Sequence, residues 1–157
     1  MPQLHDETFT DALRRAAGYG EPKESIEDLL AQIPPIDSLA DLPSGTPVWI
    51  RADLDVADRD GVIGDDPRLA SRHETLEFGR RHGWRMLRLG HRGRTPEKTL
   101  EYVHQKLKAT ESDCGPFIRE WFDERAETLT GTAVKAIESL KPGHFLVFEN
   151  VRRYSFE

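Results

Sequence analysis

Short apolar runs that alternate with helical repeats place the strongest constraint on how this chain can fold. Val48 to Ala52, Trp84 to Leu89 and Phe145 to Phe148 have the length and apolar content of buried strands, and Phe117 to Phe122 is typical of a further strand. Strands that alternate with helices form a parallel sheet. We therefore predict an α/β fold: a three-layer, Rossmann-like parallel sheet with helices on both faces.

Helical repeats fill the intervals between these runs. Residues spaced three or four apart share one face of each helix, as in amphipathic helices. The three repeats are Leu69, His73, Leu76 and Arg80; Leu100, Val103, His104 and Leu107; and Ala133, Val134, Ile137 and Leu140. Pro67 fits the start of the first helix, while Gly83 fits its end and Pro142-Gly143 fits the end of the third.

Residues 1–38 are predicted to form a helical N-terminal extension, and residues 39–157 the α/β domain. Two amphipathic repeats support the extension: Phe9, Ala12, Leu13 and Ala16, and then Ile26, Leu29, Leu30 and Ile33. Pro34-Pro35 would end the second helix. Because the extension carries no chemical motif, we expect its apolar faces to pack against the rest of the chain or against another copy.

Composition excludes several classes of protein. Hydrophobic residues make up 37% of the chain and charged residues 32%, and the apolar ones recur in periodic blocks, as in a globular protein. No apolar stretch approaches the roughly 20 residues of a membrane helix, and no secretory signal opens the chain. Its single cysteine, Cys114, excludes an intramolecular disulfide and a cysteine-based zinc cluster. We expect a cytoplasmic protein with no membrane partner and no metal site.

An arginine-rich window interrupts this acidic chain of net charge −6. Eight arginines and only two glutamates lie from Arg68 to Arg94, so the window carries a formal charge of +6. Such a patch favours an anionic partner. The acidic overall charge and the lack of interleaved aromatic residues disfavour nucleic acid.

Polar side chains follow three of the predicted strands directly. They are Asp53 and Asp55 after the first, His91, Arg92 and Arg94 after the second, and Glu149, Asn150, Arg152 and Arg153 after the last. In open parallel sheets, ligands bind in the crevice beyond the carboxyl ends of the strands. Guanidinium groups bind phosphate and carboxylate through paired hydrogen bonds. The sequence therefore predicts a site for a small anion at this edge.

Five motifs carry a resemblance to a known family. They are Arg51-Ala52-Asp53-Leu54-Asp55-Val56, the loop from Asp60 to Leu69, Thr75-Leu76, His91-Arg92-Gly93-Arg94-Thr95-Pro96, and Phe148-Glu149-Asn150-Val151-Arg152-Arg153. Each motif is weak alone, but the ordered set is specific. Over residues 39–157 the chain resembles the phosphoglycerate kinase family, in the N-terminal domain that binds 3-phosphoglycerate.

The resemblance implies an activity and a set of site residues. The family enzyme catalyses ATP-dependent, reversible phosphoryl transfer to the carboxylate of 3-phosphoglycerate in glycolysis, and a second domain binds Mg-ATP. The residues implied to bind the substrate are Asp53, Asp55, Arg68, His91, Arg94 and Arg152. Arg68 is implied to be catalytic, because it would stabilise the transferring phosphoryl group.

Other polar residues of the motifs receive structural interpretations. Asp65 and Asp66 are predicted to cap the helix that begins at Pro67. Glu149 and Asn150 are predicted to brace the loop rather than to touch substrate.

Three departures from the family pattern accompany the matches. Asp55 stands where the family has an asparagine, and its carboxylate would repel an anionic substrate unless it is protonated or paired. Thr95 displaces a proline, and Arg153 replaces an aromatic residue. No glycine-rich phosphate loop is visible, so we expect a truncated chain that lacks the nucleotide domain and binds no cofactor itself.

Two functions stay open, and the sequence leaves the enzyme question undecided. The chain is either the N-terminal part of a phosphoglycerate kinase or a truncated, non-catalytic homologue that binds a phosphorylated acid or a protein partner. In the first case the expected partner is a C-terminal nucleotide-binding domain. A homo-oligomer is a further possibility for either case.

Overall fold

The structure is a computed structural model, and it describes residues 30–64, 66–70 and 73–155. The chain divides into two compact units, Met1–Leu39 and Ala40–Glu157. In the first unit the described part ends in a 3-10 helix, η1 (Ile36–Leu39). Most of the predicted helical extension, residues 1–29, lies outside the described residues, so the domain boundary after position 38 stays a prediction.

A four-stranded parallel sheet forms the centre of the second unit. Its order is β1 (Pro47–Arg51), β4 (Arg85–Leu89), β8 (Phe145–Phe148) and β5 (Cys114–Ile118). Each strand runs parallel to its neighbour, which confirms the predicted α/β fold.

The strand β5 begins earlier than the predicted run from Phe117 to Phe122. The strand includes Gly115 and Pro116, and a proline is tolerated there because β5 is the outermost strand of the sheet. Its pairing with β8 shifts register between Cys114 and Phe117. Phe122 belongs instead to a small hairpin of β6 (Phe122–Asp123) and β7 (Thr128–Leu129).

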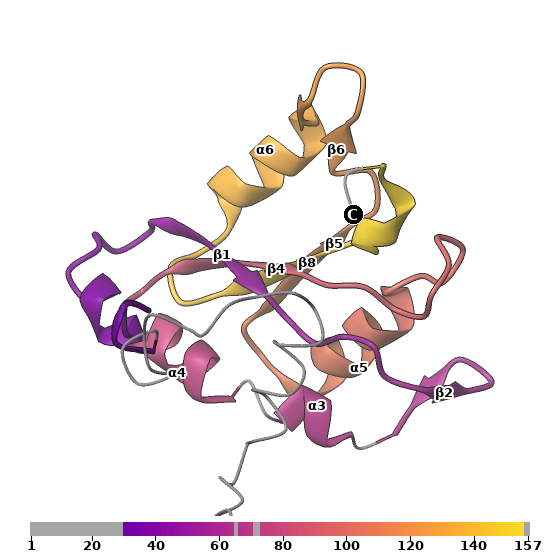
Figure 1. Ribbon diagram of the computed structural model, residues 1–157, viewed down its shortest axis with the longest axis horizontal. Coiled ribbons are helices and arrows are strands. Elements are labelled where there is room, and N and C mark those ends of the chain that lie inside the picture. Colours follow the sequence, from indigo (N-terminus) through magenta and orange to yellow (C-terminus); the bar gives the residue numbers. More distant parts are fainter. Residues whose placement is uncertain (1–29, 65, 71–72, 156–157) are drawn as a thin grey trace, which may run out of the picture. The chain divides into compact units, whose positions relative to one another are not determined.

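Helices cover both faces of the sheet, as Figure 1 shows. On one face lie α4 (His73–Arg81) and α5 (Glu101–Thr110), and on the other lies α6 (Gly131–Ser139). Two apolar clusters correspond to these layers. Met86, Phe145 and Val147 pack with α4 and α5, whereas Leu87, Leu146 and Phe148 pack with α6. The alternation follows from the two-residue period of a strand.

Two helical stretches are described within the helix predicted from Pro67 to Gly83, and residues 71–72 between them lie outside the described residues. The first is the short α3 (Pro67–Ala70), and α4 follows at His73. Asp66 caps the first segment, since its Oδ1 accepts the Arg68 backbone N–H at 2.8 Å, as predicted. Asp65 lies outside the described residues.

A second hairpin joins β1 to α3. Its strands are β2 (Asp58–Arg59) and β3 (Val62–Ile63), joined by Asp60 and Gly61 with φ of 52° and 81°. Positive φ at both central residues is the backbone of a type I′ turn, for which Asp-Gly is a preferred sequence. This hairpin lies immediately beyond the strand end that carries Asp53 and Asp55.

None of the helices in the described ranges is long and apolar enough to cross a membrane.

Candidate anion-binding site

The ends of three adjacent strands are joined by backbone hydrogen bonds. The N–H of Ala52, just after β1, donates to the Leu89 carbonyl at 2.7 Å, and Val151 N–H donates to the Gly90 carbonyl at 3.1 Å. A side chain at Gly90 would place its Cβ 2.7 Å from the Ala52 carbonyl oxygen, so only glycine allows this approach. The polar residues that follow β1, β4 and β8 therefore lie at one edge of the sheet, as predicted.

A cleft of about 410 Å³ opens at this edge. Its lining residues are Arg51, Ala52, Asp53, Asp55, Arg68 and His91. The Arg68 Nε lies 3.9 Å from the Asp53 Oδ2, with both side chains about half exposed. The same guanidinium donates through Nη1 to the backbone carbonyl of Asp55. Arg68 is thus held over the cleft by the segment that follows β1.

His91 has its hydrogen-bonding roles set by its neighbours. The Arg51 Nη2 lies 3.2 Å from the His91 Nδ1. Because a guanidinium can only donate, Nδ1 accepts, and the proton of the neutral ring sits on Nε2. That nitrogen faces the Asp55 Oδ2 at 3.8 Å.

Asp55 lines the cleft and contacts its neighbours there, although it departs from the family pattern. Its Oδ1 accepts the Gly93 backbone N–H at 2.7 Å, and its Oδ2 faces His91. Two guanidinium groups and two carboxylates line the cleft, so their formal charges balance. The two arginines and the two carboxylates together therefore give the cleft no net positive charge.

A second cleft of about 390 Å³ lies beside the first. Asp55 and Arg68 line both, and the second is completed by Val56, Ala57, Asp58, Arg92, Gly93 and Lys98. Arg68 and Asp55 thus form the wall between two polar hollows. An elongated anion with a charged group at each end could occupy both.

Arg94 and Arg152, also predicted to bind substrate, line neither cleft. Arg94 is exposed in the loop that follows β4. Arg152 lies in the 3-10 helix η2 (Val151–Arg153), and its Nη1 donates to the Gly93 carbonyl. It is linked to the site through Gly93, the residue that Asp55 also contacts.

Arg92 proves to be a structural residue, although the sequence grouped it with the anion-binding arginines. It is buried, and its guanidinium donates to the carbonyls of Val56 at 3.2 Å and Thr99 at 3.1 Å and to the Asp58 carboxylate. These contacts tie the segment after β1 to the loop after β4.

Three charged lining residues were missed: Arg51, Asp58 and Lys98. Arg51 could have been found, because it opens the first motif. Lys98 lies two positions beyond the fourth motif, and no pattern in the sequence marks it.

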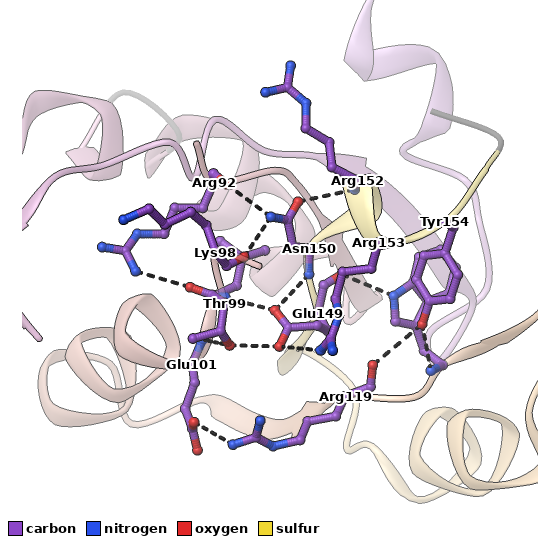
Figure 2. A network of polar contacts seen from close by, with 12 residues as sticks. Arg92, Lys98, Thr99, Glu101, Arg119, Glu149, Asn150, Arg152, Arg153 and Tyr154 are labelled. Carbon is purple, nitrogen blue, oxygen red and sulfur yellow. Dashed lines mark hydrogen bonds and ion pairs between the residues drawn. The ribbon is translucent and has the colours of Figure 1, made fainter. Parts of the chain in front are cut away.

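Glu149 and Asn150 are fully buried at the end of β8. Glu149 accepts the Leu100 N–H at 2.8 Å, and Asn150 donates to the carbonyls of Arg92 and Lys98 at 2.9 and 2.6 Å. Both therefore contact the loop after β4 rather than a cleft, which confirms that they brace it (Figure 2).

The comparisons with known proteins agree on one family. The family model described as phosphoglycerate kinase matches residues 39–157. A phosphoglycerate kinase of Clavibacter michiganensis is 35% identical over 122 residues, which cover 78% of this chain and 30% of that protein. One of Methanopyrus kandleri is 34% identical over 113 residues, covering 70% and 26%. The chain thus spans about 30% of the length of the first of these relatives.

Solved structures show the same fold. The phosphoglycerate kinase of Pyrococcus horikoshii superimposes with a TM-score of 0.58 and 23% identity, over 71% of this chain and 27% of that one. The enzyme of Coxiella burnetii gives 0.55 and 24%, over 73% and 27%.

Proposed function

Because the chain belongs to the phosphoglycerate kinase family, we propose that it binds 3-phosphoglycerate and serves as the acid-substrate part of such an enzyme. The reaction is the ATP-dependent, reversible transfer of a phosphoryl group to the substrate carboxylate, a step of glycolysis. One observation carries the proposal: Asp53, Asp55, Arg68 and His91 come from three separate motifs and line a single cleft.

The chemistry of the lining suits a phosphorylated acid. Phosphoryl transfer depends on positioning and on neutralising spread negative charge. Arg51 and Arg68 offer planar, permanently charged donors, and His91 offers a ring N–H beside them. In this proposal Arg68, at the wall between the two clefts, lies where it can reach the transferring group.

Mg-ATP supplies the phosphoryl group in the family reaction. Within the part of the chain that the structure describes, no group of His, Cys, Asp and Glu side chains could hold a metal ion. In this proposal the part of the described residues is to hold the acid and to screen its charge.

A second candidate function is a non-catalytic module that binds a phosphorylated acid. Asp55 favours it, since this carboxylate stands beside His91 and Gly93 where the family has a neutral amide. A carboxylate there weakens binding of an anionic substrate by charge repulsion.

Calorimetric titration with 3-phosphoglycerate tests both functions. We expect the chain to bind it, and Arg68→Gln to weaken binding about tenfold through loss of one charge-assisted contact. Arg125→Gln, an exposed arginine in the β6–β7 turn, is the matched control and should leave affinity unchanged. Absence of binding by the folded chain, or equal loss in both variants, would contradict the proposal. Turnover with ATP after a C-terminal nucleotide-binding domain has been supplied separates the enzyme part from the module.

A further inference from the structure

The side chain of Asn150 is fully buried and fully hydrogen-bonded. Its Nδ2 donates to the carbonyls of Arg92 and Lys98, and its Oδ1 accepts the Arg152 N–H at 3.1 Å. Two carbonyl partners require a nitrogen, and an N–H partner requires an oxygen, so the chemistry fixes the orientation of the amide. Figure 2 shows the Asn150 side chain directed toward Arg92, Lys98 and Arg152.

The two carbonyls that Asn150 binds stand at the two ends of one loop. Between Arg92 and Lys98 lie five residues, and among them Gly93 adopts a φ of 67°. A Cβ on Gly93 would come within 2.8 Å of the Lys98 side chain, so the loop closes tightly on itself. One NH₂ group therefore closes the loop at both ends.

Gly93 is also where the loop meets the candidate site. Its N–H donates to Asp55, and its carbonyl accepts from Arg152. The Asn150 amide fixes the carbonyl just before Gly93 and, through its oxygen, the backbone of Arg152. Movement of this one amide would thus shift the carbonyl that precedes Gly93 and one of the two partners of Gly93, Arg152.

Glu149 holds the adjoining end of the loop. Its carboxylate accepts the N–H groups of Leu100 and Asn150, both at 2.8 Å, and the Thr99 hydroxyl at 2.7 Å. The helix α5 has no side-chain cap at its own N-cap residue, Leu100. The carboxylate of Glu149, just after β8, supplies that cap, where negative charge is favourable with the helix dipole.

We propose that Asn150 is a positioning residue that holds loop 93–98 and Arg152 in place for binding of the phosphorylated acid. The inference rests on the proposed function. The Asn150 side chain contacts the cleft residues Arg92 and Lys98 only at their backbone carbonyls. It acts by fixing where Gly93, Arg94 and Arg152 lie.

Asn150→Asp is the sharpest perturbation. The side chain keeps its shape, but an oxygen replaces the nitrogen and faces two carbonyl oxygens, so both contacts are lost. Contact with the Arg152 N–H is retained. If the aspartate variant does not fold, Asn150→Ser gives the same test, because its hydroxyl has one donor in place of the two of the amide.

The test combines amide hydrogen exchange with calorimetry at a temperature where every variant is folded. We expect exchange at the amides between Gly93 and Lys98 to rise about tenfold or more in Asn150→Asp, and affinity for 3-phosphoglycerate to fall about tenfold. The control is Leu140→Ala, a buried residue in the α6 layer. It should lower the melting temperature while changing neither readout.

Two results would overturn the inference. One is parental exchange and affinity in the folded Asn150→Asp variant. The other is the same loss in Leu140→Ala, which would mean that stability alone governs the loop. If the parent chain binds no 3-phosphoglycerate, the proposed function fails, and the exchange comparison still decides whether Asn150 positions the loop.

Discussion

Replacing Asp55 by asparagine removes one negative charge from the cleft while conserving the shape of the side chain. The Oδ1 that accepts the Gly93 N–H at 2.7 Å is retained in an amide. The oxygen facing His91 at 3.8 Å becomes an NH₂ group. The loop contact should therefore survive, and the change is chiefly electrostatic.

The size of the effect follows from Coulomb's law. A substrate carboxylate about 4 Å from Asp55 is repelled by roughly 1 kcal/mol in a water-like medium and roughly 4 kcal/mol at an effective dielectric constant of 20. The Asp55 side chain is 42% exposed, which favours the lower part of that range. A gain of about 1–2 kcal/mol corresponds to binding roughly five- to thirtyfold tighter.

One local effect opposes this gain. Arg51 donates to the His91 Nδ1, so the ring proton sits on Nε2 and would face the new NH₂ donor. The separation of 3.8 Å keeps this donor–donor contact weak. We therefore expect the electrostatic gain to prevail.

Calorimetry with 3-phosphoglycerate measures the difference, at low salt and again at higher ionic strength. Asp55→Asn should bind more tightly, and the gain should shrink as salt screens the charge. Glu138→Gln, an exposed residue of α6, removes the same charge far from the cleft and should leave affinity unchanged. Weaker binding by a folded Asp55→Asn variant would refute the reasoning, because Asp55 would then hold the ligand rather than repel it.

Two further predictions concern stability. Arg80 contacts Glu77, Glu111 and Asp113, each at 2.6 Å. Because Arg80→Met leaves these three carboxylates without their cation, it should lower the free energy of unfolding in urea by about 2 kcal/mol. An unchanged urea midpoint would contradict this prediction. Burial raises the pKa of the Cys114 thiol from 9.0 to about 11. Since the folded state then binds the proton more tightly, stability should be full below pH 9 and fall by on the order of 1–2 kcal/mol as the pH rises toward 11. Cys114→Ala should abolish that part of the decline in stability. The same dependence of stability on pH in Cys114→Ala as in the parent chain would argue against the prediction.

The sequence was sufficient for three of the four strands of the sheet and for part of the site. Apolar runs located β1, β4 and β8, and parallel strands necessarily bring their carboxyl ends to one edge. Asp53, Asp55 and His91 could therefore be placed together from the sequence alone. Arg68 entered only through the family motif, since it lies in α3 rather than at a strand end.

The remaining features depend on contacts between distant residues. Arg92 and Arg94 lie two positions apart in one loop, yet one is buried and the other exposed. What separates them is the set of acceptors around Arg92, from Val56, Asp58 and Thr99. Local periodicity carries no information about such partners.

The loop closed by Asn150 also bears on which changes the chain can accept over evolution. Because one amide spans both ends, the number of residues between Arg92 and Lys98 is fixed, and an insertion or deletion there would separate the two carbonyls. The identity of the residues within the loop is less restricted, since Thr95 and Glu97 are exposed. Thr95, where the sequence departs from the family pattern, is one of these exposed positions, so the closure of the loop does not restrict its side chain.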